Sequence, residues 1–287
     1  MRVPSRVRCV AELPSPGIKA VRSALRGPAP PCRSAHGGAG QRARLAHMTE
    51  MRGEAQVEVL AVQVTTRSYL STTHLWMAEH CARFTADYEN KYRSDRSAFH
   101  IHQRAYTMTV VTEAVAFVEA LINEFFVDIH DSHADRYDSL GQETLKRIRE
   151  YWTVAGSGNN VSILTKYEMA RSLCGHGTYN QGCDPYQSMK AVIDLRNWQM
   201  HYRPKNVGDI SSHDVAKRLV EKFRDCDLMP NCGNAWFPDR AMGAGCAEWA
   251  VQSARAFADD FVKILGVQPN YRVVRHPIDP PPLPGEA

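Results

Sequence analysis

The sequence predicts an all-α fold in which long helices pack as one bundle. Apolar side chains recur at steps of three and four residues through most of the middle of the chain, which is the period of an amphipathic helix. No segment shows the strict apolar–polar alternation of a half-buried strand, and the sequence has no internal repeat. We therefore predict a single helical domain over residues 57–266, with a tail on each side.

Composition predicts the two tails. Residues 1–56 are rich in Arg, Pro and Gly and lack an apolar period, and residues 267–287 contain six prolines. Such segments bury too little apolar surface to fold, so both are expected to be disordered. The N-terminal segment has two further interpretations. It is Arg-rich and poor in acids like a transit peptide, or else Met48 or Met51 is the true start and the preceding residues are an over-extended reading frame.

Charge is divided unequally along the chain. The whole sequence has a net charge of +4, but residues 1–47 hold nine Lys or Arg against a single acid, Glu12. The remaining residues have a net charge of −4. A protein that binds nucleic acid over a general surface is usually basic. Any site for a polyanion on the folded part must therefore be local.

The cysteines indicate a reducing compartment. There are eight, none of them in a CxxC pair, and no secretory signal precedes them. Reduced thiols and a cytoplasmic location are expected. No apolar run reaches the roughly 18–20 residues of a membrane span, so no membrane partner is expected. No cofactor is predicted. Zinc is a weaker alternative, because five possible ligands fall within 60 residues but lack the tight pairs of structural zinc sites: Cys174, His176, Cys183, Cys226 and Cys232.

The periodic segments define the helices, which are expected at residues 69–92, 98–130, 140–155, 162–174, 186–202, 214–223 and 244–265. The second has the widest apolar face and is predicted to be central and mostly buried. Gly266 is expected to cap the C-terminus of the last helix. The polar run Asp128–His133, which follows the central helix, is expected to form a solvated turn.

The sharpest chemical signal is Asp194–Pro204, which has the sequence DLRNWQMHYRP. Pro204 is expected to stop the helix. Arg196 can bind a phosphate with its planar fork, and His201 can move a proton near neutral pH. Asn197 and His201 are four residues apart and share a helix face, which Arg196 can reach from the flank. This combination suits attack of an RNA 2′-hydroxyl on the adjacent phosphate. The structural alternative is that Arg196 pairs with an acid while His201 binds carbonyls or packs in the core.

The segment RNWQMHYRP resembles the Arg-polar-x-x-x-His signature of the HEPN superfamily, whose members are small all-helical domains. Ala114–Phe126 and Phe237–Phe261 are also similar to helices of bacterial proteins of that type. The resemblance implies an HEPN-like helical bundle and a metal-independent endoribonuclease of the toxin or phage-defence kind. It places Arg196 and His201 in the catalytic pair and Asn197 as the residue that positions them.

The same resemblance implies partners for the chain. RNA would be the substrate, an antitoxin or other protein would be a partner, and a homodimer would bring two motifs to one cleft. Glu119 and Asn123 lie one turn apart on the central helix and are candidates to orient Arg196, although they could equally form a plain buried hydrogen-bond pair. The alternative function is a non-catalytic HEPN-like protein that binds a partner or a nucleotide.

Overall fold

The computed structural model describes residues 67–95, 99–133, 135–155, 161–204, 214–228 and 235–271. Contacts divide the chain after Val62, and every described residue belongs to the unit Gln63–Ala287. The predicted N-terminal tail and the boundary at residue 57 lie outside the described residues, as does the predicted tail beyond Tyr271.

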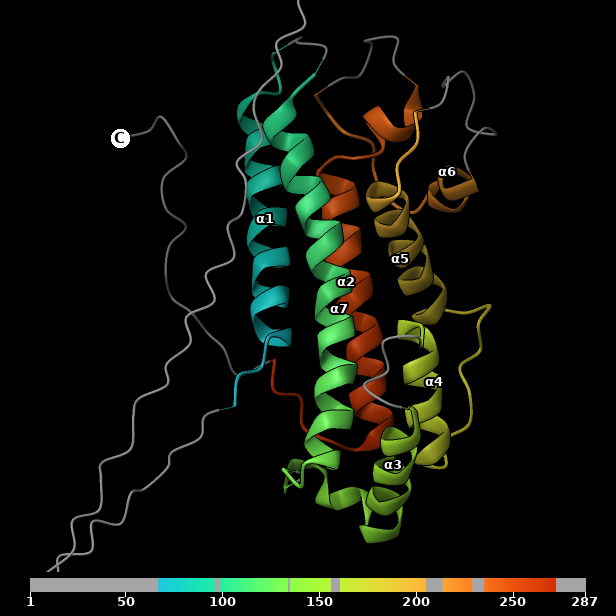
Figure 1. Ribbon diagram of the computed structural model, residues 1–287. Helices are drawn as coiled ribbons and strands as arrows, with labels where there is room; N and C mark the ends of the chain where they lie inside the picture. The colour runs from blue at the N-terminus through green and yellow to red at the C-terminus, as the bar shows by residue number, and fades with distance from the viewer. Residues whose placement is uncertain are drawn as a thin grey trace, which may run out of the picture. The chain divides into compact units, whose positions relative to one another are not determined.

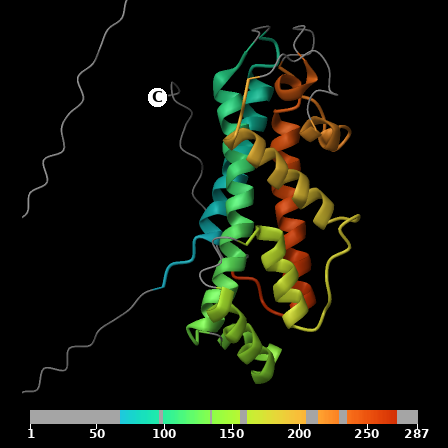
Figure 2. The same cartoon turned by 45° about the vertical axis from the view of Figure 1, so that its right-hand side comes forward.

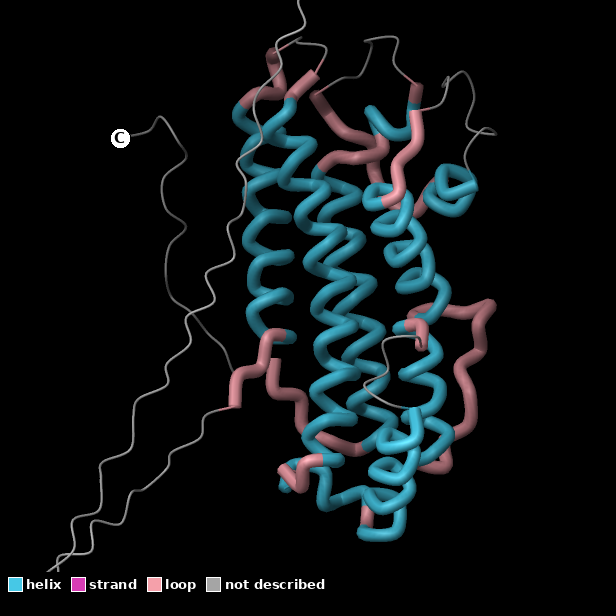
Figure 3. The backbone as a smooth tube through the Cα atoms, in the orientation of Figure 1, coloured by secondary structure: helices cyan, strands magenta, loops and turns pink. Residues whose placement is uncertain are grey.

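The described part of the chain is all-α and contains no strand (Figure 3), which confirms the predicted fold class. The elements in chain order are α1 (Ser71–Lys91), α2 (Ile101–His130), the 3-10 helix η1 (Asp135–Leu140), α3 (Gln142–Ala155), α4 (Ile163–Leu173), α5 (Tyr186–Met200), α6 (Asp214–Leu219), the π-helical turn η3 (Trp236–Arg240) and α7 (Ala244–Leu265).

Helix α2 is the centre of the bundle, as its broad apolar face predicts. It packs against α1, α3, α4, α5 and α7. Figure 1 and Figure 2 show α1, α2 and α7 running side by side as long rods, with α3, α4 and α5 following one another along the other side. Phe117, Ile122 and Phe126 of α2 are completely buried. Burial of such side chains contributes roughly 1.5–3 kcal/mol each and drives the packing.

An aromatic cluster joins α4 to α7 within the core. The ring of Tyr167 lies edge-on to Phe257 and to Phe261, with ring centres 4.7 Å apart in each pair. The Tyr167 hydroxyl donates to the carbonyl oxygen of Val118 on α2 at 2.8 Å. Burial raises the pKa of this hydroxyl well above its ordinary value, so it remains a donor.

The ends of α7 follow the prediction closely, but the next residues do not. Gly266 has φ 65°, a left-handed conformation that glycine adopts without strain, and it caps the helix as expected. The predicted tail from residue 267 begins too early, because Val267 and Tyr271 are buried and the Tyr271 hydroxyl donates to Asp259 at 2.8 Å. The tail is predicted from its number of prolines, which gives no information on whether Val267 and Tyr271 pack against the core.

Two other segments differ from the prediction. Helix α6 ends at Leu219 rather than at residue 223, and Glu221 follows with φ 62°. The loop before α7 contains η3, which no apolar period marks. Asp225 holds both ends of this turn, since it accepts from Trp236 Nε1 at 2.7 Å and from Arg240 Nη2 at 2.5 Å.

The polar run at the end of α2 is a solvated turn only in part, because His130–His133 are exposed as the sequence suggests but Asp128 is not. Asp128 is fully buried. Its carboxylate lies 3.0 Å from Arg67 Nε and 2.7 Å from Arg136 Nη2, and it also accepts from the Tyr69 hydroxyl at 3.1 Å. Two of these partners lie about 60 positions earlier in the sequence, so local composition could not reveal the cluster. A buried carboxylate of this kind requires such charged partners.

Candidate functional site

The Arg-Asn-…-His segment lies at the C-terminal end of α5. The helix ends at Met200, and His201 is the C-cap with φ −111° and ψ 28°. The backbone N–H of His201 still donates to the carbonyl oxygen of Asn197 at 3.0 Å. His201 therefore keeps a helical position relative to Asn197 although its own backbone leaves the helix. The chain then continues to Pro204 without regular structure.

Arg196 points towards the central helix but is not locked there. Its Nη2 lies 3.8 Å from Glu119 Oε2 of α2, which is an ion-pair distance without a hydrogen bond. The Arg196 side chain is 26% exposed and that of Glu119 is 43% exposed. An ion pair this accessible contributes about 1 kcal/mol or less. The guanidinium is thus free to exchange this contact for a phosphate.

Asn197 and His201 are both exposed. Around the axis of α5 they lie about 40° apart, whereas Arg196 lies about 140° from His201. Asn197 and His201 therefore lie on the solvent side of the helix, whereas Arg196 lies on the flank that faces α2. The pocket at the C-terminal end of α7 and the pocket between α5 and α6 are lined by neither Arg196 nor His201.

Asn123 contacts a residue that sequence reasoning missed. Its Oδ1 accepts from Lys166 Nζ of α4 at 2.9 Å, and Lys166 is only 3% exposed. Burial lowers the pKa of Lys166, and the nearby charge of Glu119 opposes this shift. Glu119 therefore lies beside two cations, Arg196 and Lys166. The missed signal was the position of Lys166 between Ile163 and Ala170 on the buried stripe of α4.

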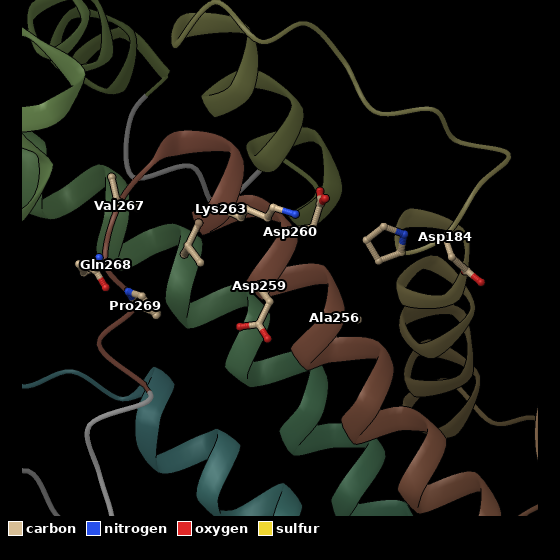
Figure 4. Close-up of a pocket in the computed structure, with 10 residues that line it drawn as sticks. Asp184, Ala256, Asp259, Asp260, Lys263, Val267, Gln268 and Pro269 are labelled. Carbon is tan, nitrogen blue, oxygen red and sulfur yellow. The ribbon is translucent and has the colours of Figure 1, made fainter.

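A different pocket, with a volume of about 650 Å³, lies where α7 meets the start of α5 (Figure 4). Its carboxylates are already engaged within the chain. Asp184 accepts from the hydroxyl and the N–H of Ser188, Asp259 accepts from Tyr271, and Asp260 lies 3.6 Å from Arg171. These carboxylates stabilise the ends of helices, so they give no reason to propose a ligand in this pocket.

The candidate zinc ligands are not brought together within the described part of the chain. Cys174, Cys183 and Cys226 are free thiols, and no group of three or more His, Cys, Asp or Glu side chains there could hold a metal ion. Cys232 lies outside the described residues. None of the described helices is long and apolar enough to cross a membrane.

No family model, curated protein or solved structure matches the chain. The function must therefore be inferred from the chemistry of the site. An accessible guanidinium, an exposed imidazole and an exposed amide at the end of one helix can bind an anion and transfer a proton.

Proposed function

We propose that the chain is a metal-independent endoribonuclease of the HEPN type, related to toxin or phage-defence systems. The main support is that Arg196 and His201, the two reactive members of the HEPN-like segment, both keep accessible side chains at the end of one helix of an all-helical bundle. A purely structural pair would have Arg196 in a buried ion pair and His201 facing the core.

In the proposed reaction the nucleophile belongs to the substrate. The RNA 2′-oxygen forms a bond to the adjacent phosphorus, the bond from phosphorus to the 5′-oxygen breaks, and a 2′,3′-cyclic phosphate and a 5′-hydroxyl result. His201 accepts the proton of the 2′-hydroxyl or supplies the proton of the leaving 5′-oxygen. Arg196 stabilises the charge that builds on the phosphorane oxygens. Asn197, on the same helix face as His201, positions the phosphate between Arg196 and His201.

A homodimer is part of this proposal. Arg196 and His201 of one chain are separated around α5 by about 140°. Two copies that pack through the ends of α5 would place Arg196 of one copy opposite His201 of the other. One imidazole could then act as the base and the second as the acid, with each motif completing the other.

The test is an incubation of the purified full chain with structured and single-stranded RNA in EDTA. We expect cleavage by the wild type and a loss of about 100-fold or more for His201→Ala, because a general acid or base contributes that much. A similar loss is expected for Arg196→Ala. The matched controls are His176→Ala and Arg147→Ala, which change exposed residues elsewhere and should cleave within twofold of wild type. Identical products from wild type and His201→Ala would contradict the proposal.

A non-catalytic HEPN-like protein that binds a partner or a nucleotide is the second candidate. The observation that favours it is the contact of Arg196 with Glu119, on the flank away from His201. In that case none of the variants cleaves RNA, and Glu119→Gln strengthens anion binding by releasing Arg196. If the chain is a ribonuclease, a substitution that changes its binding of RNA should change its cleavage of RNA in the same direction.

A further inference from the structure

A second pocket lies on the same helix as the candidate motif. It is formed between α5 and α6, which pack against one another (Figures 1 and 2), and has a volume of about 470 Å³. This volume is within the usual range for ligand sites, roughly 300–1,000 Å³. Four of the residues that line it are cations: Lys190, Lys217, Arg218 and Lys222.

The charge of this pocket departs from that of the rest of the folded part. Asp194 is the only acid in its lining, where it binds Arg218 and lies 3.6 Å from Lys190. Asp214, outside the lining, lies 3.4 Å from Lys217 but is 88% exposed, so that pair is weak. The sequence outside residues 1–47 has a net charge of −4. An excess of cations in one concave pocket, within a part of the chain whose net charge is negative, is a local site for an anion.

The pocket and the motif share one stripe of α5. Gln187, Lys190 and Asp194 line the pocket, and Asn197 and His201 follow at the next steps of three and four residues. These five positions fall within an arc of about 80° around the helix. His201 lies about 10 Å along the axis beyond Asp194, since each residue rises 1.5 Å. A chain of phosphates can therefore pass from the pocket to His201 without crossing the helix.

We propose that this pocket binds the phosphate backbone of single-stranded RNA and leads the strand along α5 to His201. The inference rests on the proposed ribonuclease function for its substrate, but not for its anion chemistry. Lysine and arginine in such a groove bind phosphates as a class and carry no base specificity. The pocket would thus set where the strand lies, and Asn197 and His201 would meet the phosphate that is cleaved.

The experiment measures binding without cleavage. The full chain is titrated into a fluorescent 2′-O-methylated RNA oligonucleotide, which lacks the attacking hydroxyl, and anisotropy is followed at several salt concentrations. The pocket variant is the double substitution Lys217→Gln with Lys222→Gln. The control, Lys146→Gln with Arg147→Gln, removes the same charge from exposed positions of α3. Lys190→Gln, half-exposed on α5 itself, is a second pocket variant that leaves α6 unchanged.

We expect the double pocket variant to bind at least tenfold more weakly at moderate salt, and Lys190→Gln to bind more weakly in the same direction. The slope of log K against log salt should fall by about 1.4 for two lost phosphate contacts with a single strand. The control pair should change affinity less than twofold. Equal losses in the pocket and control pairs would reduce the effect to net charge and overturn the proposal.

Two further measurements distinguish this inference from a site for free phosphates and from the proposed ribonuclease function. Inorganic phosphate and a nucleoside monophosphate are added as competitors. Competition by either at the concentration of the oligonucleotide would show a site for free phosphates and overturn the strand proposal. Cleavage is measured separately on unmodified RNA. If the pocket variants weaken binding while His201→Ala cleaves like wild type, the ribonuclease fails and the pocket stands. If the pocket variants bind the oligonucleotide as tightly as wild type, the pocket proposal is overturned, whatever the cleavage measurement shows.

Discussion

The Glu89 carboxylate accepts a hydrogen bond from the backbone N–H of Ala244 at 2.6 Å and thereby joins the end of α1 to the first turn of α7. The same oxygen accepts from Gln103 Nε2 of α2 at 3.0 Å. Glu89 is only 1% exposed. A carboxylate at the N-terminus of a helix satisfies free N–H groups and interacts favourably with the helix dipole. One buried side chain thus connects the three longest helices.

Replacing Glu89 should therefore destabilise the bundle. We expect Glu89→Ala to lower the free energy of unfolding by about 2–3 kcal/mol, because it leaves the Ala244 N–H and the Gln103 amide without this acceptor. Glu143→Ala, at an exposed position in the first turn of α3, is the control and should cost about 1 kcal/mol or less. Urea unfolding followed by circular dichroism measures both. Equal midpoints for the two variants would contradict the proposed role.

The two glycines at the start of α7 are required by close contacts. A Cβ on Gly243 would lie 2.6 Å from Glu89 Oε1 and 2.6 Å from Cys226 Cβ, and a Cβ on Gly245 would lie 2.3 Å from the carbonyl oxygen of Arg224. Gly243→Ala and Gly245→Ala should each destabilise by about 1–3 kcal/mol, since the neighbours must move. Gly182→Ala is the matched control, because the nearest atom to its Cβ lies at 3.6 Å. Thermal melts that rank Gly182→Ala with the other two would refute the steric argument.

The ion cluster at the end of α2 gives a third prediction. Asp128→Asn keeps the shape of the side chain but removes the charge that Arg67 and Arg136 share. We expect a loss of about 1.5–3 kcal/mol, as for hydrogen bonds to charged groups. Asp138→Asn, on an exposed position of η1, should change stability by less than about 0.5 kcal/mol. An equilibrium unfolding curve of Asp128→Asn that overlays wild type would exclude the cluster as a stabilising element.

The cysteines predict a graded reactivity. Burial raises the pKa of Cys246 to about 12, and burial with the charge of Glu89 raises the pKa of Cys226 to about 12. Alkylation requires the thiolate, so in the native protein at pH 8 exposed Cys183 should react with iodoacetamide long before either. Peptide mass spectrometry after timed labelling checks the order, and labelling in denaturant is the control. Early modification of Cys246 would contradict its burial.

The same shifts predict how stability depends on pH. A thiol whose pKa is raised on folding contributes fully below its unfolded pKa, and this contribution is lost as pH rises towards the folded value. Above the ordinary thiol pKa of 9.0, Cys246 should therefore cost about 1.4 kcal/mol of stability per pH unit. Cys246→Ala should show a shallower decline between pH 9 and 10.5 than wild type. Parallel declines for the two proteins would count against the shift.

Helices with a long apolar period were predictable from the sequence, and long-range polar contacts were not. The ends of α7 follow from its periodicity and from Gly266, and the shared face of Asn197 and His201 follows from helix geometry alone. The partners of Asp128 and Lys166 come from other helices, and no local pattern contains them. Lysine counts also did not predict the pocket between α5 and α6, because its cations gather only when the two helices pack.

The ion cluster around Asp128 has a consequence for the smallest part of the chain that keeps the fold intact. Two of its groups, Arg67 and Tyr69, precede α1 and contact a carboxylate at the end of α2. A chain shortened to Met48 or Met51 retains them, whereas one that begins at Ser71 keeps every described helix but loses both. The folded domain therefore starts ahead of its first helix, and four residues without regular structure, 67–70, belong to it as much as the helices do.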